Sequence, residues 1–70
     1  MNELGRYIRN HRLDSAMTQE EFSYKIKVTN VTMSHLENGQ RVGAKTLKKL
    51  SVYLKLPTKA LRRMMLNEDN

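Results

Sequence analysis

A chain of 70 residues with no cysteine has few ways to hold a fold together. A domain of this size buries only about 60% of the surface that its unfolded chain exposes, so its stability is marginal. Without cysteine there is no disulfide, thiolate nucleophile or thiolate metal ligand, and two histidines alone do not make a zinc site. The sequence therefore predicts one domain without metal or cofactor, stabilised by well-packed helices or by a partner subunit.

No segment has the apolar length that a membrane span or a secretory signal requires. The longest apolar runs are two or three residues, whereas a helix needs about 20 residues to cross a bilayer. The opening residues MNELGRYIRN lack the apolar core of a secretory signal. We therefore expect a cytoplasmic protein with no membrane partner.

The charges are divided unevenly along the chain. Residues 1–37 hold five basic and five acidic side chains, whereas residues 38–66 hold eight basic side chains and no acidic one. Such a segment repels itself and attracts polyanions. Nucleic acid is the leading explanation, and a solvated basic surface is the alternative.

Apolar side chains recur at three- and four-residue spacing in five short segments, which predicts five helices. The expected helices cover residues 2–14, 18–26, the stretch between Thr29 and Asn38, 45–54 and 58–66. No run of alternating β-branched residues indicates a sheet. The predicted fold is all-α, a compact bundle of five short helices in one domain over residues 1–66, with residues 67–70 as a frayed polar tail.

Polar residues and one glycine mark the ends of the middle helices. The segment TQEE at 18–21 is a capping box, in which Thr18 accepts from the Glu21 amide and the Glu21 carboxylate reaches back to Thr18. Thr29 is placed to cap the third helix, and Gly39 to end it in the left-handed conformation. The three residues 27–29 separate the second and third helices, as in a helix-turn-helix, although any αα-hairpin has this spacing.

The segments that carry a family resemblance are Ile8-Arg9 with Arg12, MTQEEF at 17–22, Ile26, MSHLENG at 33–39, and LKKL at 47–50 with Leu54. On these segments, the stretch from Leu4 to Leu61 resembles the DNA-binding domain of lambdoid phage repressors and Cro proteins, the XRE-like group. TQEEF and LENG, separated by residues 23–35, are the specific part. The resemblance implies a lambda repressor-like bundle with a central helix-turn-helix.

The sequence departs from the family pattern at four places. Ser23 stands where the family usually has the small residue Ala, and Gly43-Ala44 stands where a Pro-containing loop is common. Lys27 and Lys55 replace usual glycines. If the backbone is left-handed there, each lysine costs about 1–2 kcal/mol.

The resemblance implies supporting roles for three residues. Arg12 and Glu37 form a partly buried structural ion pair that links the first helix to the end of the third; two independent surface charges are the alternative. Gln19 opens the second helix, where the family position hydrogen-bonds a backbone phosphate and can buttress the third helix. An ordinary first-turn glutamine is the alternative.

The third helix supplies the candidate base contacts, because its outer face lies opposite Met33, Leu36 and Glu37. Asn30 could pair with adenine, Val31 could contact a thymine methyl, and His35 either contacts DNA or is merely solvated. The full set of base-contact candidates is Asn30, Val31, Thr32, Ser34 and His35.

Phosphate contacts are expected around the third helix. The candidates are Gln19, Asn38, Gly39, Arg41 and Lys45. The resemblance implies that backbone amides of residues 38–41 meet phosphate. We expect Lys48 and Lys49 to be solvated.

The segment Met64-Met65-Leu66 beside Arg62-Arg63 has three interpretations: it closes the core, frames a dimer interface or docks another protein. We favour a dimer interface. Its candidates are Val52, Ala60, Leu61, Met64 and Met65.

No catalytic motif is present, neither HExxH, GxxxxGK nor GxGxxG, so we do not expect an enzyme. The expected function is that of a bacterial or phage transcriptional regulator that binds double-stranded DNA sequence-specifically. We expect a repressor that binds a palindromic operator as a homodimer, through the third helix in the major groove. The alternative is a protein-interaction module on the same fold, such as an antitoxin-like partner or a cofactor of a larger complex.

Overall fold

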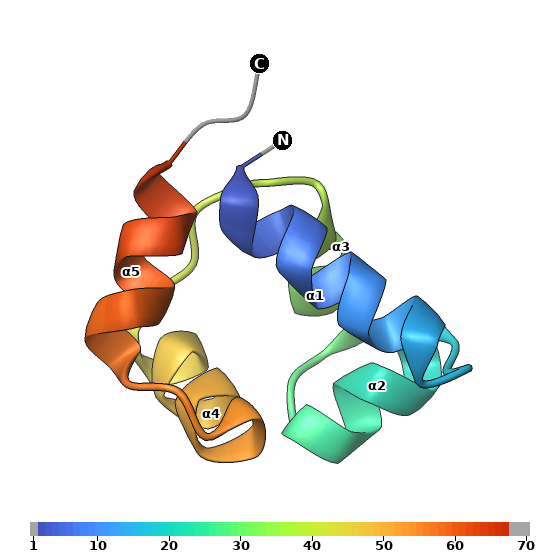
Figure 1. The fold of residues 1–70 in the computed structure, drawn as a ribbon. Helices are drawn as coiled ribbons and strands as arrows, with labels where there is room; N and C mark the ends of the chain where they lie inside the picture. The colour runs from blue at the N-terminus through green and yellow to red at the C-terminus, as the bar shows by residue number, and fades with distance from the viewer. Residues whose placement is uncertain (1, 68–70) are drawn as a thin grey trace.

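Five helices follow one another through short turns. The computed structural model describes residues 2–67. Within them α1 spans Glu3–Asp14, α2 Gln19–Ile26, α3 Asn30–Glu37, α4 Ala44–Leu54 and α5 Thr58–Leu66 (Figure 1). The predicted all-α fold is confirmed. None of the helices in this part of the chain is long and apolar enough to span a membrane.

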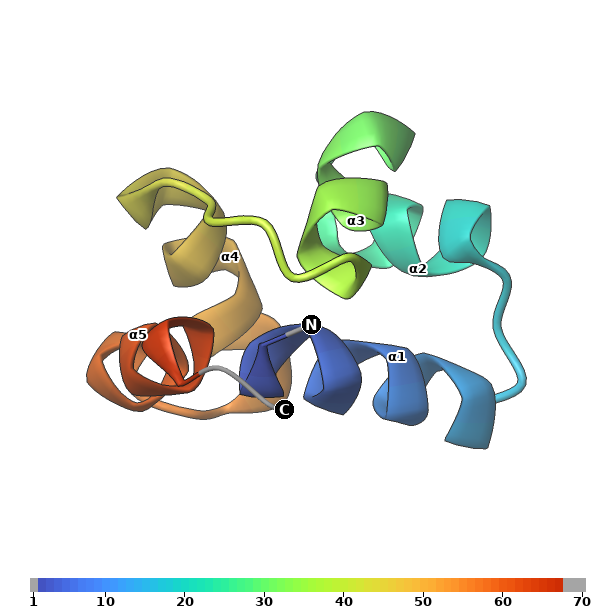
Figure 2. The ribbon, with the colours of Figure 1, turned by 90° about the horizontal axis from the view of Figure 1, so that it is seen from above.

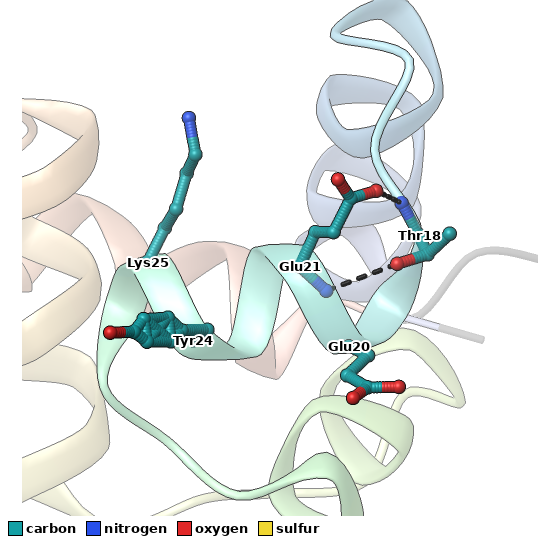
Figure 3. A pocket seen from close by; sticks show the side chains of 5 residues that line it. All are labelled: Thr18, Glu20, Glu21, Tyr24 and Lys25. Atoms are coloured by element: carbon teal, nitrogen blue, oxygen red, sulfur yellow. Dashed lines mark hydrogen bonds between the residues drawn. The ribbon is translucent and has the colours of Figure 1, made fainter.

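The predicted caps are present at the helix-turn-helix. The Thr18 hydroxyl accepts from the Glu21 amide at 3.1 Å, and Glu21 Oε1 accepts from the Thr18 amide at 2.9 Å (Figure 3). This backbone hydrogen bond is the main reason that the pKa of the exposed Glu21 carboxyl is lowered. The Thr29 hydroxyl accepts from the Thr32 amide at 3.1 Å. Gly39, with φ 84°, takes the left-handed conformation after α3.

Among residues 2–67, three non-glycine residues adopt the left-handed conformation. Lys27 (φ 67°) and Lys55 (φ 58°) do so where the family pattern has glycine, and Ala16 (φ 55°) does so between α1 and α2. Each carries strain of about 1–2 kcal/mol. Lys49 is exposed, as expected for a solvated face, and its Nζ also donates to the Lys27 carbonyl at 2.7 Å. A side chain of α4 thus holds the turn between α2 and α3.

The core draws side chains from every helix. α1 packs against α3 and α5, α2 packs against α3 and α4, and α4 also packs against α5. The buried apolar residues are Leu4, Ile8, Phe22, Ile26, Met33, Leu36, Leu47, Leu50, Leu61 and Met65.

Two residues in this core correct the dimer prediction. Leu61 and Met65 were expected on a surface, but they lie inside the chain's own core. They stand four residues apart on α5, so their side chains share one helix face. That face packs inward, against α1 and α4.

α1 and α3 approach each other at a glycine. A Cβ atom added to Gly5 would lie 2.6 Å from the Leu36 carbonyl oxygen and 3.1 Å from that of Glu37. These are backbone atoms, which cannot turn aside as a side chain can. Gly5 therefore sets how closely α3 rests on α1.

The end of the domain extends one residue beyond the prediction. Asn67, assigned to the frayed tail, donates from Nδ2 to Glu3 Oε1 at 2.9 Å, and its carbonyl accepts from the Glu3 amide at 2.9 Å. The remainder of the predicted tail, residues 68–70, lies outside the described residues.

Candidate nucleic-acid interface

Helix α3 forms one edge of the molecule. Figure 2 shows its first turn as the part farthest from α1, with the start of α2 on one side and the start of α4 on the other. Val31 is 64% exposed, and Asn30 and His35 are also exposed, whereas Thr32 and Ser34 are half-buried. The structure thus brings the five base-contact candidates onto one projecting helix.

The side chain of Asn30 is tethered to α2. Ser23 Oγ lies 2.7 Å from Asn30 Oδ1 and 2.8 Å from the Glu20 carbonyl oxygen. A hydroxyl has one hydrogen, so both contacts are satisfied when Ser23 donates to Glu20 and the Asn30 amide is turned to donate its NH₂ to Ser23. Ser23, a departure from the family pattern, orients a candidate base contact.

The expected pair of Arg12 and Glu37 is present. Arg12 Nε lies 2.7 Å from Glu37 Oε2, and Nη2 lies 3.1 Å from Oε1. The Arg12 Nη1 also donates to the Met17 carbonyl at 3.1 Å. The hydrogen bond to Glu37 raises the pKa of Arg12. Since only 4% of Glu37 is exposed, the pair fixes the end of α3 to α1.

Gln19 joins the same cluster. Its Nε2 donates to Glu37 Oε1 at 3.3 Å, so the start of α2 also rests on the end of α3. The geometry therefore gives Gln19 the buttressing role that the resemblance implied, and its contact with phosphate stays a prediction.

This arrangement has a counterpart among known families. A family model described as a helix-turn-helix domain matches residues 3–64, from the start of α1 into α5. The chain belongs to the helix-turn-helix domain family. The match is of the Cro-like type, as the TQEEF and LENG segments indicated. No curated protein was found to match the chain as a relative.

Membership supports a DNA-binding regulator in general terms, in a family that is typically non-enzymatic. In this domain α2 and α3 are the paired helices of the helix-turn-helix, a motif in which the second helix is generally the recognition helix that lies in the major groove.

The loop after the recognition helix corrects one expectation. The amides of Asn38, Gly39 and Gln40 already donate to carbonyls within α3, at 3.0, 3.2 and 2.9 Å. They close the end of the helix and are not available to phosphate. The prediction that the amides of residues 38–41 meet phosphate is therefore wrong for residues 38–40, because the helix end needs the same donors, and it stays a prediction for the Arg41 amide.

The start of α4 offers donors in their place. Gly43 caps α4 without a side-chain hydrogen bond, and the first turn contains Lys45 and no acidic residue. Arg41 and Lys45 are both exposed. Uncapped amides at a helix start together with two cations favour a phosphate group.

Two residues of this helix-turn-helix domain were missed by the sequence analysis. Gly5 carried no local signal, since glycine inside a helix is only a weak propensity penalty. Asn2, just before Glu3, carried an N-cap signal, and its Oδ1 does accept from the Gly5 amide at 2.8 Å. Its two further bonds, to Gly39 and Met65, join distant parts of the chain and leave no trace in local sequence.

Proposed function

We propose that this helix-turn-helix domain is a sequence-specific regulator of transcription, a repressor that places α3 in the major groove of double-stranded DNA. The observation that carries the proposal is the projecting first turn of α3. That turn exposes Asn30 and Val31, and His35 is exposed one turn later, while Met33 and Leu36 on the opposite side are buried. An exposed valine in a polar helix suits a thymine methyl, which only the major groove presents.

A side-chain amide on one flank of α3 and two cations on the other support the same orientation. Gln19 opens α2, and Arg41 and Lys45 stand just before and just inside the start of α4. Figure 2 shows the starts of these two helices on opposite sides of α3. In protein–DNA interfaces, contacts to phosphate fix position, and contacts to base edges carry the sequence information. We therefore assign Gln19, Arg41 and Lys45 to affinity and the α3 residues to specificity.

We propose that the working unit is a homodimer on a palindromic operator. One domain of this kind covers only half a site, and a two-fold pair places its recognition helices about 34 Å apart, one turn of DNA. With Leu61 and Met65 in the core, the residues left for a partner copy are Val52, which is 76% exposed, and the half-buried Ala60 and Met64.

Fluorescence anisotropy of a labelled duplex at several salt concentrations tests the DNA-binding part. If a dimer neutralises about six phosphates, the logarithm of the binding constant falls with the logarithm of salt concentration with a slope near −5. An affinity that does not change with salt contradicts the proposal and favours the protein-interaction module.

Sedimentation with a palindromic duplex tests the dimer. We expect two copies on each duplex, and we expect Met64→Ser to lower the cooperativity of binding. Met65 is not a suitable site for this test, because a polar residue there would disrupt the core. A single copy per duplex at high protein concentration excludes the dimer.

A further inference from the structure

We infer that Asn2 is a positioning residue for DNA binding: it ties the loop of residues 38–43 to the end of α5. This inference rests on the proposed function. It concerns how the cations beside α3 are held, not whether α3 enters the groove.

The carboxamide of Asn2 joins three parts of the chain. Nδ2 donates to the Gly39 carbonyl at 3.1 Å and to the Met65 carbonyl at 2.9 Å, and Oδ1 accepts from the Gly5 amide. Both amide hydrogens are therefore used. Asn2 is 1% exposed, so water cannot replace these partners.

A second contact connects the loop with the same residue of α5. The Val42 amide donates to Met65 Sδ at 3.4 Å. Met65 thus holds the loop at two points, residue 39 through Asn2 and residue 42 directly. Figure 1 shows the loop running behind the start of α1 to reach α4 beside α5.

These contacts fix the segment that carries the proposed phosphate donors. Gly39 has φ 84°. A glycine adopts positive and negative φ values about equally readily, so on its own it does not fix the direction of the chain that follows. Holding its carbonyl selects one direction for the chain that continues to Arg41 and the start of α4. A segment ordered before binding does not lose that conformational freedom on DNA.

A variant separates positioning from helix capping. Asn2→Ser keeps a hydroxyl that caps α1 but removes both amide hydrogens that reach Gly39 and Met65. Ile8→Val is the matched control, because Ile8 of α1 is buried in the core and its apolar side chain cannot hydrogen-bond to the loop. Both variants are compared at a temperature at which circular dichroism shows them folded.

The first readout is backbone amide exchange without DNA. We expect Asn2→Ser to speed exchange at Gln40 and Val42, and to leave Phe22 in α2 as in Ile8→Val. The second readout is duplex affinity against salt. We expect Asn2→Ser to weaken binding about tenfold and to reduce the steepness of the salt dependence by about one unit, with neither change in Ile8→Val.

The inference is overturned if Asn2→Ser behaves as Ile8→Val does in both readouts. If Asn2→Ser does not fold, Asn2→Thr takes its place, since the threonine hydroxyl also caps α1 and threonine lacks the two amide hydrogens that reach Gly39 and Met65. Faster exchange at Val42 with a shallower salt dependence supports the inference, and an unchanged salt dependence overturns it. If the unmodified protein binds no duplex, the proposed function fails, whereas amide exchange still tests the link between the loop and α5.

Discussion

Glu37 Oε2 lies 2.7 Å from Arg12 Nε, and the two side chains are only 4% and 14% exposed. The second carboxylate oxygen accepts from Arg12 and from Gln19. One carboxylate at the end of α3 is therefore bonded to both α1 and α2. The position of α3 therefore depends on this polar cluster as well as on apolar packing.

Replacing Glu37 by Gln leaves the Arg12 guanidinium largely buried without a counter-charge. Breaking such a pair from one side costs about 3 kcal/mol, which chemical denaturation measures directly. Glu20→Gln is the control, since Glu20 is exposed and its loss costs about 0.5 kcal/mol. Equal stability of the two variants would show that the pair does not hold the fold.

Gly5→Ala tests the close approach of α1 and α3. The added methyl would meet two backbone carbonyls, so we expect a loss of about 2 kcal/mol in the free energy of unfolding, despite the better helix propensity of alanine. Gly43→Ala is the matched control, because a Cβ at Gly43 meets nothing within 4 Å. A Gly5→Ala protein as stable as Gly43→Ala would contradict the observed packing.

The capping box makes the free energy of unfolding depend on pH in the acidic range. The pKa of Glu21 is lowered in the folded protein, so its contribution is complete above the ordinary Glu pKa of about 4.3 and is lost as the pH falls through the folded value. Glu21→Gln keeps a capping acceptor without the titration. We expect the free energies of unfolding in urea of the unmodified protein and of Glu21→Gln to differ less in acid than at neutral pH. A constant difference would mean that the Glu21 carboxylate has no such role.

A glycine at position 27 should relieve the backbone strain of the left-handed Lys27. Lys27→Gly removes about 1–2 kcal/mol of left-handed strain, and part of this gain is offset by the freedom of glycine in the unfolded chain. We expect a net gain of about 0.5–1 kcal/mol in thermal unfolding, with the Lys49 contact to the carbonyl retained. Lys25→Gly, inside α2, serves as the control and loses about 1 kcal/mol. A loss at both positions would contradict the strain at Lys27.

The two classes of DNA contact predict different variant behaviour. Val31→Ala or Thr32→Ala relaxes preference at one or two base pairs, each worth roughly 1–3 kcal/mol. Arg41→Ala or Lys45→Ala weakens binding to all sequences alike and makes the salt dependence shallower. Binding to a panel of single-base operator variants separates the classes. If the α3 variants and the Arg41 and Lys45 variants gave the same pattern, the assignment of α3 to sequence specificity would be wrong.

Local signals in the sequence predicted most of the fold. Thr18, Thr29 and Gly39 mark helix ends by chemistry that acts within four residues, and the structure places those ends within about one residue of the expected positions. The resemblance added the pair of Arg12 and Glu37, which no local rule reveals because the partners lie 25 residues apart.

The errors share one physical cause. Helical spacing identifies Leu61 and Met65 as an apolar face, but it does not say whether that face meets the chain's own core or a second copy. Likewise, the turn that ends α3 at Gly39 uses backbone amides that could otherwise donate hydrogen bonds to a phosphate. Both outcomes depend on three-dimensional competition for the same surface or donor. Asn2 was missed because its distant partners exist only after folding.

The most direct test of the central claim is selection of duplexes from a random pool by the purified protein. We predict enrichment of a palindromic sequence whose half-sites lie about one DNA turn apart, and loss of preference within each half-site for Val31→Ala. Recovery of an unenriched pool, with binding that depends on salt alone, would contradict sequence-specific recognition by α3.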